Sequence, residues 1–145
     1  MIKDYVYPIV DYRAVDGDTI EVVLDCGFNA TLRMYCRLHG VDTPERKHGE
    51  AYVLCKQVTE RWLEEITKRD IRVQSIAKDK YAGRFIGEVF DARYRVVSLN
   101  TFLLEKRLGQ PYDGGTRLAW DTGSLNDVCE IAGALLGRHR MLDVE

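Results

Sequence analysis

Alternation of apolar and polar residues over short segments is the feature of this sequence that most constrains its fold. The alternating apolar residues are Ile20, Val22 and Leu24 in one segment and Ala30, Leu32 and Met34 in the next. A period of two is typical of half-buried β-strands. The segment from Tyr5 is rich in Val, Ile and Tyr, and turn-forming residues lie at 16–18 and 26–29. The pattern therefore predicts three successive antiparallel strands.

A long amphipathic helix is predicted next, followed by two more strands. Apolar residues recur at steps of three or four, at Ala51, Cys55, Val58, Trp62 and Ile66. This is the period of an α-helix that buries one face, so we expect a helix from Gly49 to about Lys68. Beyond it, alternation predicts strands at 71–76 and 84–90, separated by a turn at 79–83.

Two shorter helices are expected in the last third of the chain. Ser98 can cap a helix that stops near Gly109, and Ser124 can cap a final helix at about 124–138. The stretch 110–123 between them is polar and rich in glycine. We expect it to be a surface loop that could flank a site.

This order of elements predicts a single α+β domain over residues 1–145. A chain of 145 residues fits one hydrophobic core. Five short strands can close on themselves, and the first helix follows the third strand. We therefore expect a five-stranded antiparallel OB-type Greek-key barrel with three helices.

The charge of the chain excludes a strongly basic, histone-like DNA binder. The formal net charge is −2 and the isoelectric point is about 5.9. The charge is unevenly distributed, because residues 33–107 carry sixteen basic and eleven acidic groups between acidic ends.

The sequence also predicts the compartment of the protein and the state of its cysteines. No apolar stretch reaches the ~20 residues of a membrane span, and no basic-then-apolar leader is found, so we expect a soluble, cytoplasmic protein without a signal peptide. The four cysteines form no C-x-x-C pair, which argues against a zinc or redox site. A disulfide stays open as an alternative to buried, reduced thiols.

Three polar clusters lie at strand ends or turns, at 16–19, 37–45 and 79–84. Oxygen ligands from Asp18, Asp42 and a loop carbonyl suit a hard cation such as Ca²⁺ or Mg²⁺. The absence of a His/Cys cluster argues against zinc or copper. Arginine forks in these clusters can grip phosphate oxygens, and a carboxylate can take a proton from water. Together the clusters predict phosphate chemistry.

The same clusters carry a family resemblance. The runs VDGDT (15–19), RLHGVDTPE (37–45) and DKYAGR (79–84), in this order and with a long helix between the second and third, resemble the staphylococcal nuclease (thermonuclease, micrococcal nuclease) family. The resemblance covers roughly residues 8–115. It implies an OB-type barrel with helices and a Ca²⁺-dependent hydrolysis of phosphodiesters in DNA and RNA that leaves a 3′-phosphate.

The resemblance implies a role for each matching residue. Asp18 and Asp42 match the calcium-binding carboxylates, and Thr43 matches the residue that lends a backbone carbonyl. The phosphate-gripping arginines match Arg37 and Arg84, and the carboxylate that activates or orients the attacking water matches Glu45. The substrate-contacting residues match Lys80, Tyr81 and, in a looser register, Tyr112.

The sequence departs from the family pattern in two ways. Ala82 is inserted between Tyr81 and Gly83, so Arg84 keeps its place only if the extra residue is absorbed as a bulge. The chain is also slightly acidic, with 21 Lys and Arg against 23 Asp and Glu, and residues 116–145 have no close counterpart. Weaker binding to long polyanions, or a smaller or different nucleic-acid substrate, could follow.

The sequence leads to one function with two alternatives. We expect a calcium-dependent nuclease that acts as a monomer on DNA or RNA. A compact nuclease of this kind could serve a phage or mobile element. One alternative is a non-catalytic nucleic-acid-binding OB-fold module, and the other is a metal-dependent phosphodiesterase for a small nucleotide. A decayed copy should have lost at least one key residue, yet all are present: Asp18, Arg37, Asp42, Glu45 and Arg84.

Overall fold

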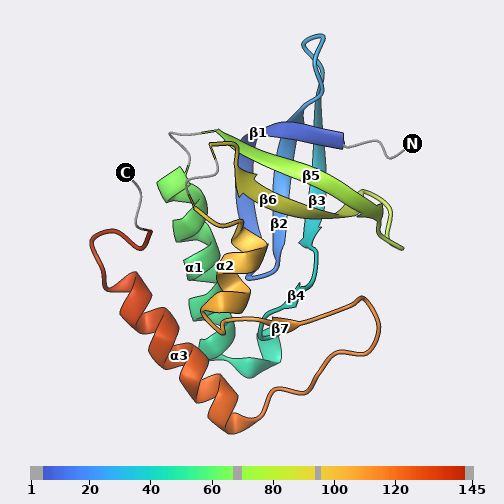
Figure 1. Cartoon of the computed structure of the whole chain (residues 1–145). Coiled ribbons are helices and arrows are strands. Elements are labelled where there is room, and N and C mark those ends of the chain that lie inside the picture. The colour runs from blue at the N-terminus through green and yellow to red at the C-terminus, as the bar shows by residue number, and fades with distance from the viewer. Residues whose placement is uncertain (1–4, 67–69, 94–95, 143–145) are drawn as a thin grey trace.

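The computed structural model describes residues 5–66, 70–93 and 96–142 (Figure 1). The barrel strands are β1 (Tyr5–Asp16), β2 (Thr19–Asp25), β3 (Thr31–Leu38), β5 (Ile71–Lys78) and β6 (Arg84–Asp91). The helices are η1 (Arg46–His48, a 3₁₀ turn), α1 (Glu50–Ile66), α2 (Leu99–Glu105) and α3 (Thr122–Leu136). Two short strands, β4 (Val41–Asp42) and β7 (Gln110–Pro111), complete the set for the described residues. The predicted α+β class is confirmed.

The five long strands form a closed barrel in the order β1-β2-β3-β6-β5. Four neighbouring pairs are antiparallel, but β3 and β6 run parallel, with Tyr35 opposite Arg84 and Leu38 opposite Gly87. The predicted five-stranded barrel is therefore confirmed, and the prediction that it is antiparallel is wrong for one pair, β3 and β6. Strand directions cannot alternate all the way around a closed ring of five strands, so at least one neighbouring pair has to be parallel. The observed mixed barrel is consistent with an OB-type barrel.

The prediction of which residues of β2 and β3 face inward is correct only for the parts of the strands that the barrel encloses. Ile20, Val22 and Leu24 of β2 are buried, as are Cys36 and Leu38 of β3. The other end of the β2–β3 hairpin projects beyond the barrel as an arm (Figure 1). Leu32 is 50% exposed and lines a pocket with Leu24 and Met34, and Ala30 precedes the strand.

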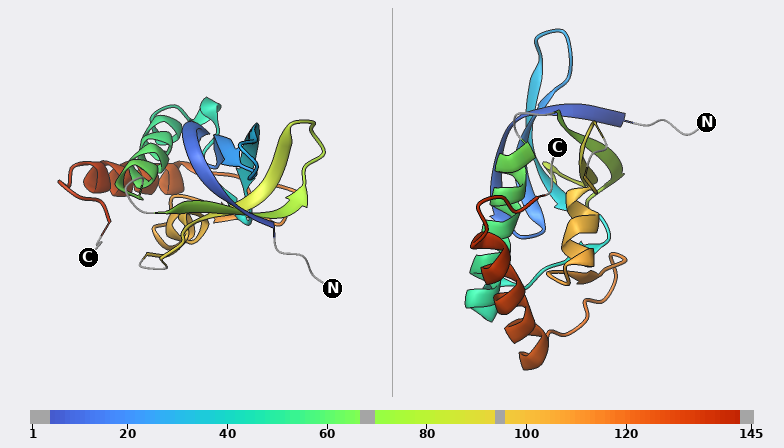
Figure 2. Two further views of the ribbon diagram at one scale, coloured as in Figure 1. Left: turned by 90° about the horizontal axis from the view of Figure 1, so that it is seen from above. Right: turned by 60° about the vertical axis from the view of Figure 1, so that its left-hand side comes forward.

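Helix α1 buries the stripe that its sequence predicts. Ala51, Cys55, Val58, Trp62 and Ile66 are all buried in the core. Figure 2 shows α1 and α3 packed side by side on one flank of the barrel. The predicted end of the helix, Lys68, lies outside the described residues.

Both later helices are present as predicted, but the N-cap residue of one of them differs from the prediction. Ser98 caps α2, since its hydroxyl accepts a hydrogen bond from the Thr101 amide at 3.1 Å. Helix α3 begins at Thr122, and its cap is Asp121, whose carboxylate accepts from the Ser124 amide at 2.7 Å. The prediction that Ser124 is the cap is wrong, because Ser124 already lies in the first turn of the helix and donates there.

The small sheet formed by β4 and β7 was not predicted, and it places the loop after α2 beside the second polar cluster. Val41 pairs with Pro111, and Asp42 pairs with Gln110. Gly109 allows this approach, because a Cβ there would lie 2.2 Å from Cγ2 of Val41. The predicted loop 110–123 is therefore shorter, at 112–121, because β7 takes its first two residues and α3 takes its last two.

Two expectations about compartment can be compared with the structure. All four cysteines lie in described residues, and all are free thiols. Among the helices of the described ranges, none is long and apolar enough to cross a membrane.

Candidate active site

The turn between β1 and β2 is held against α1 and presents Asp18. Thr59 of α1 donates its hydroxyl hydrogen to the Gly17 carbonyl at 2.6 Å. Gly17 packs so closely that a Cβ would lie 2.7 Å from Oγ1 of Thr43 and 3.1 Å from Cβ of Cys55. On the other side, the Thr43 amide donates to Oδ2 of Asp18 at 3.0 Å. The close approach of Gly17 therefore brings the first two polar clusters together.

Arg37 lies beneath this junction and is only 5% exposed. Its Nη1 donates to the Val41 carbonyl at 2.8 Å and lies 3.4 Å from Oδ2 of Asp18. Its Nη2 lies 3.4 Å from Oδ1 of Asp42. The guanidinium is thus held in one orientation by the backbone of the cluster and by two carboxylates.

Asp42 is more deeply buried than Asp18, at 2% against 7% exposed. Burial raises the pKa of Asp42 above its ordinary value, and the negative charge of Asp18 raises it further. The charges of Arg117 and Arg37 act in the opposite direction without cancelling the rise. The pair of carboxylates therefore carries repulsion that a bound cation would relieve.

Glu45 follows Pro44 and stands at the start of the η1 turn. Its amide donates to Nδ1 of His48 at 2.9 Å, so this histidine has a local structural role. Burial alone would raise the pKa of Glu45, but the charge and hydrogen bond of Arg117 outweigh it, with help from Lys47. The pKa of Glu45 is therefore lowered, and the carboxylate is ionised at neutral pH.

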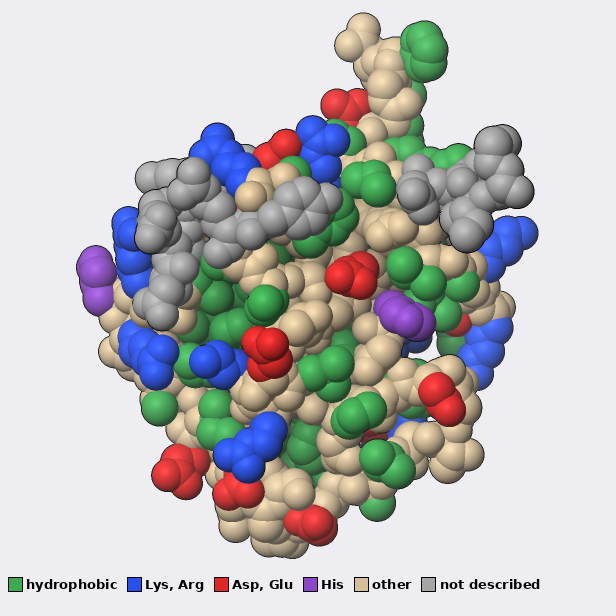
Figure 3. Space-filling view, in the orientation of Figure 1, with side chains coloured by type: hydrophobic (Ala, Val, Ile, Leu, Met, Phe, Trp, Pro, Cys, Tyr) green, Lys and Arg blue, Asp and Glu red, His purple; other side chains and the backbone are tan. Residues whose placement is uncertain are grey.

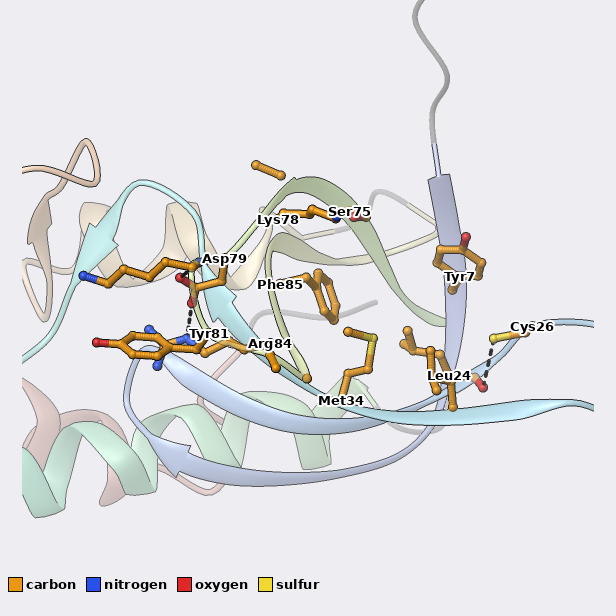
Figure 4. A pocket seen from close by; sticks show the side chains of 15 residues that line it. Tyr7, Leu24, Cys26, Met34, Ser75, Lys78, Asp79, Tyr81, Arg84 and Phe85 are labelled. Carbon is orange, nitrogen blue, oxygen red and sulfur yellow. Dashed lines mark hydrogen bonds and ion pairs between the residues drawn. The ribbon is translucent and has the colours of Figure 1, made fainter.

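Arg84 is the first residue of β6, and it forms an ion pair with Asp79 (Figure 4). Its guanidinium carbon lies 5.4 Å from the centroid of the Tyr81 ring. Ala82 lies in the turn before β6, and the irregular register of this hairpin is instead between Ser75 and Ala77. The irregularity of this hairpin therefore lies on β5, and Ala82 lies outside both strands.

These segments enclose a polar cleft of about 300 Å³. Five of the predicted site residues line it, namely Asp18, Arg37, Thr43, Glu45 and Arg84. Asp42 lies under the cleft in contact with Arg37. On the face shown in Figure 3, the loop that follows β7 stands off the barrel, and acidic and basic side chains are interspersed.

The three predicted substrate-contacting residues lie around this cleft and not in its lining. Lys80 and Tyr81 line a neighbouring, more apolar pocket of about 580 Å³ at the mouth of the barrel, and Arg84 borders both (Figure 4). The Tyr112 ring packs on Arg37, with 5.2 Å between its centroid and the guanidinium carbon. The apolar pocket is larger, but the titratable groups converge in the polar cleft.

The donor set of the cleft suits a hard cation in part. Asp18, Asp42 and the Thr43 carbonyl offer oxygen atoms alone, as Ca²⁺ prefers. No group of three or more His, Cys, Asp or Glu side chains able to hold a metal converges within the described residues. A cation here would need water or substrate oxygens to complete its shell of six to eight ligands.

Two residues that sequence reasoning missed help to form the site. Arg117, from the loop after β7, lines the cleft and forms ion pairs with Glu45 and Asp42. Asn100 of α2 donates to the carbonyls of His39 at 2.9 Å and Gly87 at 3.1 Å. It thereby ties the second polar cluster to β6. A buried amide in an apolar helix was the one signal that could have indicated Asn100.

The cleft thus combines residues from four separate parts of the chain: 16–19, 37–46, Arg84 and Arg117. In comparisons with known proteins, no family model and no curated protein matches this chain. Its function therefore has to be argued from the chemistry of the cleft.

Proposed function

We propose that the protein is a calcium-dependent nuclease that hydrolyses phosphodiester bonds of DNA or RNA and leaves 3′-phosphate ends. One observation carries the proposal. Two arginines and two carboxylates, Arg37, Arg84, Asp18 and Glu45, line a single cleft of about 300 Å³, and the buried Asp42 pairs with Arg37. This is the set of groups that phosphodiester hydrolysis requires, namely phosphate grips, oxygen ligands for a cation and a base.

The arginines supply donors for the charge that develops on phosphate oxygens. Arg37 is held by the Val41 carbonyl at 2.8 Å, so little ordering of its side chain is needed when substrate binds. Arg84 is more exposed, with 29% of its side chain accessible, and its fork must leave or share Asp79 to reach a phosphate. Such preorganised donors act mainly on the transition state.

Asp18, Asp42 and the carbonyl of Thr43 are the residues that would hold the cation. Bound Ca²⁺ would neutralise charge on the phosphate as a Lewis acid. The raised pKa of Asp42 reflects burial and the nearby charge of Asp18, and a divalent cation stabilises two adjacent carboxylates of this kind. The Thr43 amide keeps Asp18 in place from the protein side at 3.0 Å.

Glu45 is the proposed base. Its lowered pKa leaves it ionised at neutral pH, able to accept a proton from the attacking water. The water oxygen forms a bond to phosphorus in line with the bond to the 5′ oxygen, which breaks. The leaving 5′ oxygen takes a proton from solvent, and the phosphate stays on the 3′ oxygen.

One observation favours the alternative of a non-catalytic nucleic-acid-binding module. Each arginine of the cleft core already has a carboxylate partner: Arg37 pairs with Asp18 and Asp42, and Arg84 pairs with Asp79. Such pairs can stabilise a fold without supporting catalysis. The two functions differ in whether a bond is broken.

A cleavage assay separates these functions. Labelled single-stranded DNA, duplex DNA, RNA and a dinucleotide are incubated with Ca²⁺, with Mg²⁺ or with a chelator. The proposal predicts cleavage in Ca²⁺, none in chelator, and fragments whose mobility changes after phosphatase removes a 3′-phosphate. The control is Arg33→Ala, because Arg33 pairs with Glu21 outside the cleft and its loss should leave the rate unchanged. Binding without cleavage under every metal would favour the alternative.

A further inference from the structure

Arg117 reaches the cleft from a segment that is otherwise exposed to solvent. Every residue from Asp113 to Ala119 is exposed, and the segment arches away from the rest of the molecule between β7 and α3 (Figure 1). The Arg117 side chain turns back toward the barrel. There it pairs with Glu45 and lies 3.6 Å from Oδ1 of Asp42.

Apart from the ion pairs of Arg117, the segment is held at its two ends. At one end the Tyr112 amide donates to the Gly40 carbonyl at 3.1 Å, and at the other Asp121 caps α3. Gly114 has a positive φ of 93°, and Leu118 is 58% exposed. Apart from Arg117, these residues bury little, so moving the arginine costs little packing.

The contacts of Arg117 conflict with the proposed chemistry. Asp42 is a proposed cation ligand and Glu45 is the proposed base, and Arg117 neutralises both. A guanidinium and a divalent cation that contact the same buried carboxylate repel each other, although solvent around the exposed Arg117 side chain screens part of this repulsion. Full occupation by both at once is therefore unfavourable.

We propose that Arg117 is a removable counter-ion that couples cation binding to nucleic-acid binding. In the free protein it neutralises Asp42 and Glu45 and weakens the cation site. When a nucleic acid enters, Arg117 transfers to a backbone phosphate, which its fork suits, and the two carboxylates become available. This inference rests on the proposed function and assigns to Arg117 a regulatory and substrate-binding role at the same cleft.

The transfer has a thermodynamic consequence that binding measurements can detect. If nucleic acid removes Arg117 from the carboxylates, it must raise the affinity for Ca²⁺, and Ca²⁺ must raise the affinity for nucleic acid by the same factor. Removing the side chain should strengthen Ca²⁺ binding in the free protein and remove the part of this coupling that Arg117 carries. The centroid of the Tyr112 ring lies 5.2 Å from the guanidinium carbon of Arg37 and 5.9 Å from that of Arg117, so the ring offers a surface along which the Arg117 guanidinium can move.

The test is a calorimetric titration of Ca²⁺ into the full chain, with and without a phosphorothioate oligonucleotide that resists cleavage. We expect Arg117→Ala to bind Ca²⁺ on the order of tenfold more tightly than the parent when no oligonucleotide is present. The oligonucleotide should raise the affinity of the parent for Ca²⁺ and that of the variant much less. Arg33→Ala, which removes a charge outside the cleft, should behave like the parent. Arg117→Lys, which keeps the charge but loses the fork, should match the parent in Ca²⁺ affinity when no oligonucleotide is present.

Two results would overturn the inference. Equal affinity of the parent and Arg117→Ala for Ca²⁺ would show that Arg117 does not compete with the cation, whereas Ca²⁺-dependent cleavage by both would leave the proposed function intact. Failure of both proteins to bind Ca²⁺, with or without oligonucleotide, would also overturn it. The cleavage assay in chelator then shows separately whether the nuclease proposal fails as well.

Discussion

Replacing Gly17 with alanine introduces a methyl group at the point where the β1–β2 turn meets the second polar cluster. The new Cβ would lie 2.7 Å from Oγ1 of Thr43 and 3.1 Å from the Cβ atoms of Thr43 and Cys55. Rotation of the Thr43 side chain would move its hydroxyl away, but neither Cβ can move without its backbone. Thr43 is 2% exposed and Cys55 is fully buried, so neither has free space to enter.

The cost can be estimated from this geometry. Forcing one methyl group into a packed site typically destabilises a protein by about 1–3 kcal/mol. For a domain of this size that corresponds to a fall of roughly 4–12 °C in the midpoint of thermal unfolding. Because Asp18 follows Gly17 directly and accepts from the Thr43 amide, the same displacement should lower the rate of Ca²⁺-dependent cleavage.

A matched substitution controls for the loss of glycine itself. Gly133 lies on the exposed face of α3, and a Cβ there meets nothing within 4 Å. Gly133→Ala should therefore stabilise the protein by roughly 0.5–1 kcal/mol, because alanine favours the helix. Thermal unfolding of the two variants beside the parent is the assay. If Gly17→Ala unfolds at or above the midpoint of the parent, the close approach is not what positions Asp18.

Three further substitutions test separate parts of the account. Arg84→Lys keeps the charge but loses the fork, so kcat on an oligonucleotide should fall by ~10²-fold, and near-full activity would remove Arg84 from the phosphate. In chelator, Asp42→Asn should unfold at a higher temperature than the parent, because the pKa of Asp42 is raised in the folded state. The difference between the two unfolding midpoints should vanish below pH 3.8, the ordinary pKa, and should grow as pH rises through the raised pKa. Melting curves recorded over a pH series measure this difference. Asp121→Ala should lower the midpoint of thermal unfolding more than Ser124→Ala does, because the Asp121 carboxylate accepts the capping hydrogen bond. A larger loss in Ser124→Ala would show that Ser124 is the cap.

Much of the fold was predictable because burial leaves a period in the sequence. One face of α1 is buried along its length, and the apolar residues from Ala51 to Ile66 repeat accordingly. The same holds for β2, where Ile20, Val22 and Leu24 face the core. The parallel pairing of β3 with β6 leaves no such trace, because it follows from closing a ring of five strands.

Short strands and caps were harder for local reasons. Strands β4 and β7 have two residues each, which is too few to show a period. Asp121 and Ser124 are both residues that cap helices, and they are three positions apart. The cap is the residue that directly precedes the first helical residue, and residue type alone does not show where the helix begins.

The candidate site was predictable where its residues are clustered in the sequence. The clusters at 16–19 and 37–45 meet at the hydrogen bond that the Thr43 amide donates to the Asp18 carboxylate. Arg117 gave no such indication, because it is 72 residues from its partner Glu45 and lies in a loop without periodicity. Long-range ion pairs of this kind depend on the tertiary path of the chain.

The most direct test of the nuclease proposal measures binding and cleavage in Glu45→Gln. This variant keeps the size of the side chain but removes the oxygen that accepts the proton. In Ca²⁺, we expect it to bind a phosphorothioate oligonucleotide nearly as tightly as the parent and to cleave the matching phosphodiester oligonucleotide at least ~10²-fold more slowly. Cleavage by Glu45→Gln at the rate of the parent would contradict the assignment of the base. Binding without cleavage by the parent would contradict the proposal that this cleft hydrolyses phosphodiesters.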